Sequence, residues 1–174
     1  GRIGDILEVP AEQDDPDAFN AGYVEAVTPR HVLLWNLTPW GQPDGWVLRR
    51  TEDVVQVFMG DDFEVRLQML LEMQGFSHDP LFEKQPGEDS DLLVLCLQRA
   101  QENGEIISMM TADDTYTGTI AHLDDLRVTV NNLDFFGAPD GTRSFPLREI
   151  MLVEVGTNEE KMYKRLGDER LKLL

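Results

Sequence analysis

"NLTPWGQPDG" (36–45) and "NLDFFGAPDG" (132–141) are two versions of one decapeptide, and they decide how the chain is organised. Both begin with Asn-Leu, carry a central glycine and end in Pro-Asp-Gly. Pro presets φ, Asp hydrogen-bonds its own backbone and Gly accepts positive φ, so Pro-Asp-Gly predicts a β-turn. A catalytic loop present twice should repeat an acid, a base or a nucleophile, yet the only repeated ionisable residue is Asp44/Asp140 inside that turn sequence. We therefore interpret the pair as one structural turn made twice.

The match between the decapeptides belongs to a much longer internal repeat. An offset of 96 residues aligns 22–70 with 118–166 without a gap, and 12 of the 49 pairs are identical. Chance gives roughly three identities over such a length. The sequence therefore predicts a tandem duplication of one small unit.

Each copy is predicted to be mostly β, with a helix at its end. Strands are expected at 5–9 and 105–110, hairpins over 21–37 and 117–133, and further strands over 46–60 and 142–156, because apolar residues alternate there between turn signals. A helical period follows Gly60 and Gly156. Another helix is expected over 90–104, with acids in its first turn and Gly104 as its C-terminal stop.

The unit resembles the small β-barrel of Sm and Sm-like proteins. The resemblance rests on a strand, a bent hairpin that opens with Gly-x-[Val/Ile], and a strand that ends in [Asp/Glu]-[Val/Ile]-x-x-Val. In the second copy, "GTIAHLD" (118–124) is similar to the family's Gly-x-[Leu/Ile]-x-x-x-Asp. Val32 and Val128 stand where the family has an RNA-contacting Asn, and the family's late Arg-Gly is missing from both copies.

The resemblance implies a mainly β fold with flanking helices (α+β), built from two tandem copies of a small, strongly bent β-barrel or sheet. It implies a shared fold without the RNA site. Small barrels of the SH3-like and PRC kinds fit the same pattern nearly as well.

Charge and composition exclude several classes of protein. The chain of 174 residues has a formal net charge of −18, and the acid excess is heaviest in 1–21 and 76–117. Such an excess repels phosphate backbones, so nucleic acid is not an expected partner. No stretch approaches the roughly 20 apolar residues that span a bilayer, and the first twenty residues do not look like a signal peptide. We expect a cytoplasmic protein without membrane association, and its single cysteine excludes an internal disulfide.

Six residues are candidates for a binding surface: Trp35, Trp40, Asp44, Trp46, Phe136 and Asp140. The aromatic pair Trp40/Phe136, just before the central glycine, either caps the core, which we favour, or grips a partner. All three tryptophans fall in the first copy, so a binding face is expected there.

No chemistry-bearing motif accompanies these candidates. The three histidines and the single cysteine, Cys96, lack zinc spacing, and no phosphate-binding glycine loop, nucleophile elbow or calcium loop is present. We expect no catalytic residue, no metal and no cofactor.

These observations predict a first small barrel with a C-terminal helix at 1–75, an acidic linker at 76–90, and a second copy with N-terminal and C-terminal helices at 91–174. The expected function is non-enzymatic association with macromolecules. The expected partner is a protein, with a second copy of the chain as a further partner. One alternative is an Sm-like RNA-associated protein, and another is a small-ligand binder or enzyme with its pocket between the copies.

Overall fold

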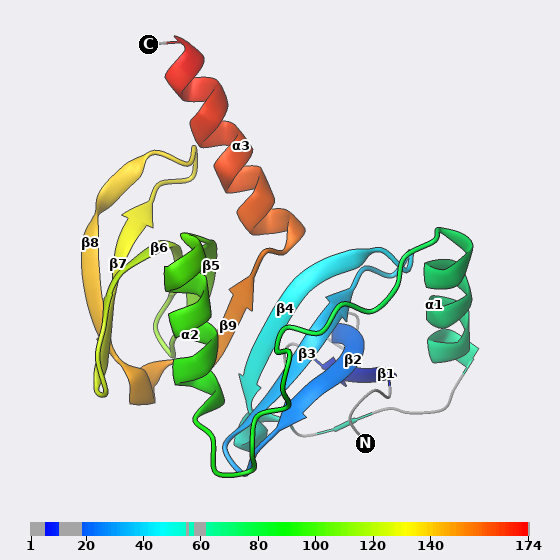
Figure 1. Cartoon of the computed structure of the whole chain (residues 1–174). Coiled ribbons are helices and arrows are strands. Elements are labelled where there is room, and N and C mark those ends of the chain that lie inside the picture. The colour runs from blue at the N-terminus through cyan, green and yellow to red at the C-terminus, as the bar shows by residue number, and fades with distance from the viewer. Residues whose placement is uncertain (1–5, 11–18, 55, 58–61, 174) are drawn as a thin grey trace. The chain divides into compact units, whose positions relative to one another are not determined.

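The computed structural model describes residues 6–10, 19–54, 56–57 and 62–173. The chain divides into two compact units, Gly1–Leu92 (unit 1) and Leu93–Leu174 (unit 2), shown in Figure 1. Antiparallel strands and three helices make the described part an α+β fold, as expected from the sequence. The strand expected over 46–60 lies partly outside the described residues, which lack 55 and 58–61.

Unit 1 contains four strands that pair in chain order, each antiparallel to the next. A 3-10 turn and a helix follow them. The elements are β1 (Ile6–Pro10), β2 (Phe19–Val27), β3 (His31–Leu37), β4 (Pro43–Arg50), η1 (Thr51–Asp53) and α1 (Asp62–Met73). The core forms where Trp35 and Leu37 of β3 pack with Leu67 and Leu71 of α1, burying their apolar surface.

Unit 2 has a longer sheet, ordered β9-β5-β6-β7-β8. A helix leads into this sheet and another follows it. The elements are α2 (Leu92–Asn103), β5 (Ile106–Met110), β6 (Thr115–Leu123), β7 (Arg127–Leu133), β8 (Pro139–Pro146), η2 (Leu147–Glu149), β9 (Leu152–Val155) and α3 (Asn158–Leu173). Gly104, with φ of 62°, ends α2 as predicted.

The sequence predicts a strongly bent β-barrel or sheet, and the barrel form is wrong, because the strands that the structure describes form an open order. In unit 2, β9 and β8 stand at opposite ends of the strand order and do not pair with each other. The same holds for β1 and β4 in unit 1. Pro139 and Pro146 stand at the two ends of β8, and proline lacks the N–H that a further ladder would need.

The interpretation of Pro-Asp-Gly as the turn is also wrong. The turns are residues 38–41 and 134–137, where the N–H of each central glycine, Gly41 or Gly137, donates to the carbonyl three residues earlier at 2.9 Å. Both glycines have positive φ, 71° and 72°. Pro-Asp-Gly instead opens β4 and β8, and its glycine, with φ of 68° or 77°, lies in a β-bulge. The decapeptide therefore contains a turn followed by a bulge.

The two units share local geometry at the 96-residue offset. Strands β2, β3 and β4 begin and end 96 residues before β6, β7 and β8, and α1 begins 96 residues before α3. The register of the first hairpin shifts between Val24 and Ala26, and that of the second between Ile120 and His122, again 96 residues on. The bulges opposite Asn36 and Asn132 are also 96 residues apart.

Candidate binding site

The turns at 38–41 and 134–137, here called the aromatic turns, carry exposed aromatic side chains. Trp40 is 68% exposed, Phe136 is 62% exposed and its neighbour Phe135 is 78% exposed. The favoured interpretation of Trp40 and Phe136 as caps over the core is therefore wrong, because these rings face solvent. Phe135 was not among the sequence candidates, although it stands beside Phe136 in the quoted decapeptide.

The aromatic turn of unit 1 is held against α1. Gln74 at the end of the helix donates its side-chain N–H to the carbonyl of Trp40 at 2.9 Å. A Cβ on Gly41 would lie 2.6 Å from the Cβ of Leu70, so only glycine lets the turn approach this closely. Arg66 of α1 lies 5.8 Å from the centre of the Trp40 ring, within cation–π range.

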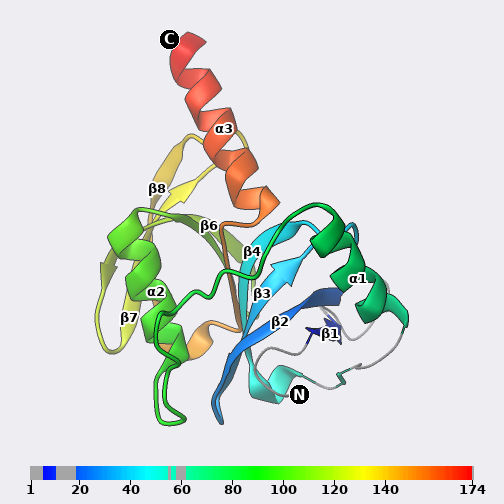
Figure 2. The same cartoon turned by 45° about the vertical axis from the view of Figure 1, so that its right-hand side comes forward.

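The aromatic turn of unit 2 is held against α3 in a similar way, and both views show the β7–β8 connection beside that helix (Figures 1 and 2). A Cβ on Gly137 would lie 2.3 Å from the carbonyl oxygen of Tyr163. Asp134 accepts hydrogen bonds from the N–H groups of Phe136 and Ala138 at 2.9 and 2.8 Å, an arrangement typical of an Asx turn. Its other carboxylate oxygen lies 3.6 Å from Arg170 of α3.

The repeated acid of the decapeptide has a structural partner in both units. The amide nitrogen of Asn36 donates to Asp44, and that of Asn132 donates to Asp140, each at 3.3 Å. Each asparagine lies on the strand opposite the bulge that contains its aspartate. Asp44 and Asp140 therefore link β3 to β4 and β7 to β8 across the bulges.

Trp35, another sequence candidate, is 4% exposed and belongs to a buried aromatic cluster of unit 1. The ring of His78 stacks on Tyr23, with centroids 4.9 Å apart, and lies 5.0 Å from the Trp35 ring. His78 also bonds Glu25, which is 2% exposed and whose second oxygen accepts the N–H of Leu81 at 3.3 Å. A buried carboxylate is costly unless it is paired, so this contact fastens the segment after α1 to the sheet.

Sequence reasoning missed the Glu25–His78 pair. The two residues are 53 positions apart, and neither belongs to a motif. Glu25 stands in the β2 bulge, where its counterpart at the 96-residue offset is Ala121. Trp46, the remaining tryptophan candidate, is half-buried and packs against the same core as Trp35.

The two units differ most on the face of the sheet that carries Trp35 in unit 1 and Asn131 in unit 2, here called the α-face. Directly paired residues of antiparallel strands lie on one face, as do alternate residues along a strand. The α-face of unit 1 is apolar, and that of unit 2 is polar at the same positions. The pairs are Tyr23/Thr119, Leu33/Thr129, Trp35/Asn131, Trp46/Thr142 and Leu48/Ser144.

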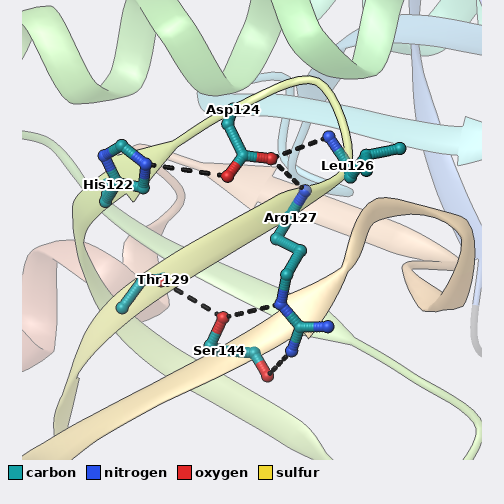
Figure 3. Close-up of polar contacts among 6 residues, drawn as sticks. All are labelled: His122, Asp124, Leu126, Arg127, Thr129 and Ser144. Carbon is teal, nitrogen blue, oxygen red and sulfur yellow. Dashed lines mark hydrogen bonds and ion pairs between the residues drawn. The ribbon is translucent and has the colours of Figure 1, made fainter.

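One part of the α-face of unit 2 holds a polar network (Figure 3). The Arg127 guanidinium donates to the hydroxyl and the carbonyl of Ser144 at 3.1 and 3.0 Å, and the hydroxyl of Thr129 lies 3.2 Å from that of Ser144. In the hairpin turn, Asp124 accepts the N–H groups of Leu126 and Arg127 at 2.8 and 2.9 Å. These backbone hydrogen bonds hold the pKa of Asp124 below its usual value.

The other part of the α-face forms an apolar groove with α3. The groove has a volume of about 500 Å³ and is partly open to solvent. Its walls are the start of β5, the middle of β6, the end of β7, the β7–β8 connection and residues of α3. The lining residues include Ile106, Thr119, Leu133, Ala138, Tyr163 and Leu171, with Lys164, Asp168 and Arg170 at the rim.

Burial also shifts the pKa values of His31 and Cys96. Burial lowers the pKa of His31 and raises that of the Cys96 thiol to about 12, so the thiolate is not available near neutral pH. Within the described residues no group of three or more His, Cys, Asp or Glu could hold a metal ion. None of the helices in those ranges combines the length and apolar character needed to cross a membrane.

Comparisons with protein-family models, curated proteins and solved structures found no match for this chain.

Proposed function

We propose that this chain is a non-enzymatic module that associates with partner proteins through its two aromatic turns. The observation that carries the proposal is the exposure of Trp40 in unit 1 and of Phe135 and Phe136 in unit 2, at equivalent turns. Aromatic residues are enriched at protein interfaces, where a few well-placed side chains carry most of the binding energy.

The support that each helix gives its turn strengthens the proposal. Ordering a flexible loop on binding costs free energy, and a turn that is already held in place avoids that cost. Gln74 holds the turn of unit 1, and the contact of Asp134 with Arg170 holds the turn of unit 2. Each aromatic turn is therefore already in contact with a helix of its own unit.

We propose further that the two units arose by duplication of one ancestral unit. The shared element bounds, register shifts and positive-φ glycines at the 96-residue offset support this origin. Their α-faces then diverged, so that the face is apolar in unit 1 and polar at the same positions in unit 2.

We also propose that each unit is related to the Sm-like proteins. The resemblance rested on three segments of unit 2. The first strand corresponds to β5, the bent hairpin to β6 and β7, and the final strand to β8, η2 and β9. Val32 and Val128, which replace the family's RNA-contacting Asn, are both buried. That burial disfavours an RNA contact at this position.

The test compares variants in which the exposed rings are removed. Trp40→Ala, and Phe135→Ala combined with Phe136→Ala, should reduce recovery of a partner protein from native lysate at an unchanged melting temperature. Leu126→Ala is the matched control, because Leu126 is 75% exposed in a different turn. A recovered partner, purified and titrated, should bind the ring variants about tenfold or more weakly.

Two further arms separate the alternatives. Sedimentation of the pure chain shows whether a second copy is the partner, because a concentration-dependent dimer should be lost in the ring variants. Recovery that disappears after RNase treatment would favour the RNA-associated alternative. Equal recovery by wild type, ring variants and control would refute the proposal.

A further inference from the structure

We propose that the groove between α3 and the α-face of unit 2 binds a free α-amino acid with a bulky apolar side chain. This inference does not depend on the proposed function, which rests on the aromatic turns. A volume of about 500 Å³ lies within the range of small-molecule sites, which are mostly apolar and carry a few well-placed polar groups.

The apolar body of the ligand is indicated by comparison with unit 1. At the equivalent place in unit 1, Tyr23, Trp35 and Leu71 fill the space between sheet and helix. At the 96-residue offset these residues are Thr119, Asn131 and Gly167, all smaller, and of these Thr119 and Gly167 line the groove. Tyr163 stands where unit 1 has the smaller Leu67, but the space that Tyr23 and Leu71 occupy in unit 1 is left open, and an aromatic or aliphatic side chain would fill it.

The charged groups of the ligand are indicated by the rim. Lys164 and Asp168 stand one turn apart on α3, both line the groove, and neither forms an ion pair with a residue that the structure describes. The third charged rim residue, Arg170, is already paired with Asp134. A free cation beside a free carboxylate fits the α-carboxylate and α-ammonium groups of an amino acid.

This zwitterion accounts for the whole rim better than a simple anion or cation does. An apolar anion would be attracted by Lys164 but repelled by Asp168. An apolar cation would be attracted by Asp168 but repelled by Lys164. In unit 1 the counterparts of Lys164 and Arg170 are the uncharged Gln68 and Gln74. The two cations are therefore present only in the unit that lacks the aromatic side chains of the unit 1 core.

The first experiment uses three probes with one ring system and different charges, titrated by calorimetry. L-Tryptophan carries both charges, indole-3-propionate lacks the ammonium and tryptamine lacks the carboxylate. We expect L-tryptophan to bind saturably and each of the other two about fivefold more weakly. No saturable binding by any probe, or equal binding by all three, would overturn the proposal.

Variants assign each charge to its partner. Lys164→Gln should weaken L-tryptophan about fivefold but leave tryptamine unchanged, because tryptamine has no carboxylate. Asp168→Asn should weaken L-tryptophan and tryptamine but leave indole-3-propionate unchanged. Lys161→Gln, which removes an exposed cation of α3 outside the groove, is the matched control and should change nothing. The opposite assignment, or equal effects of Lys161→Gln and Lys164→Gln, would refute the site.

A filling variant tests the position of the ring. Thr119→Tyr restores the side chain that unit 1 carries at this place and should abolish binding of all three probes. Ala138→Phe fills the groove from the turn side, and serves if Thr119→Tyr does not fold. Undiminished L-tryptophan binding by a folded filling variant would show that the ligand binds elsewhere.

Discussion

At the scale of single residues, glycine serves two different purposes within one decapeptide. Gly137 and Gly141 both have positive φ, which costs a residue with a Cβ free energy. Gly137 also lies against α3, where an added Cβ would meet the carbonyl oxygen of Tyr163, whereas a Cβ on Gly141 meets nothing within 4 Å. The first glycine allows a close approach and the second only a backbone conformation.

This difference predicts unequal losses of stability. Gly141→Ala should lower the free energy of unfolding by about 1 kcal/mol, the cost of left-handed backbone. Gly137→Ala should lower it by about 3 kcal/mol, because the clash with the helix adds to that cost. Urea unfolding measures both. Equal losses of unfolding free energy would mean that α3 moves away from the added Cβ at no cost in free energy.

A second prediction at this scale concerns the pH dependence contributed by Asp124. Its pKa is lowered in the folded chain by hydrogen bonds from the N–H groups of Leu126 and Arg127 (Figure 3). Because the pKa of Asp124 is lower in the folded chain, its carboxylate stabilises the fold at pH values above the unfolded pKa of about 4. This stabilisation is lost as the pH falls through the folded pKa. Wild type should therefore exceed Asp124→Asn in urea midpoint at pH 7, and the difference should vanish in acid. A difference that grows on acidification would contradict this assignment.

At the scale of elements, the N-terminus of α3 depends on one buried carboxylate. Glu160 is 2% exposed, and its two oxygens accept the N–H of Thr157 at 2.7 Å and the hydroxyl of Ser108 at 2.6 Å. Thr157 and Glu160 have the spacing of a capping box, and Ser108 ties that box to β5. One side chain thus caps the helix and joins it to the sheet.

Removing this carboxylate should release the helix from the sheet. Glu160→Ala should lower the free energy of unfolding by roughly 1–3 kcal/mol, since it removes the cap and leaves the buried N–H of Thr157 without its acceptor. Glu159→Ala, at the exposed neighbouring position, should change it by less than about 0.5 kcal/mol. Thermal melting and hydrogen exchange in α3 report the two effects. A silent Glu160→Ala would show that the cap is dispensable.

At the scale of the whole molecule, charge is divided unevenly between the units. Unit 1 has 19 acids and 6 bases, a net charge of −13, and unit 2 has 14 acids and 9 bases, a net charge of −5. Both units therefore repel polyanions, and the cations of α3 are too few to offset this.

The chain should accordingly show no tight binding to mixed RNA at near-physiological salt. Binding of RNA releases counterions in proportion to the phosphates neutralised, and this chain has no basic run to neutralise them. Fluorescence anisotropy with labelled RNA measures the binding. Sub-micromolar binding that weakens steeply with added salt would favour the Sm-like RNA-associated alternative instead.

The sequence by itself determined the local order of the elements. Alternating apolar residues predicted the hairpins, and Gly104 predicted the end of α2, because these signals act on the backbone near them. It did not determine which glycine makes the turn, since Gly41 and Gly45 both tolerate positive φ. That choice depends on α1, because the turn lies so close to the helix at Gly41 that an added Cβ would meet Leu70.

The tertiary structure alone decided which candidates face solvent and where a pocket lies. Trp35 and Trp40 are only five positions apart, but the first packs against α1 and His78 while the second is exposed, because strand pairing and helix docking set the two environments. The exchange of Tyr23 for Thr119 was visible in the sequence, yet the groove that Thr119 lines is completed by residues of α3 that are distant in the sequence. Burial arises from contacts between distant segments, and local patterns do not contain them.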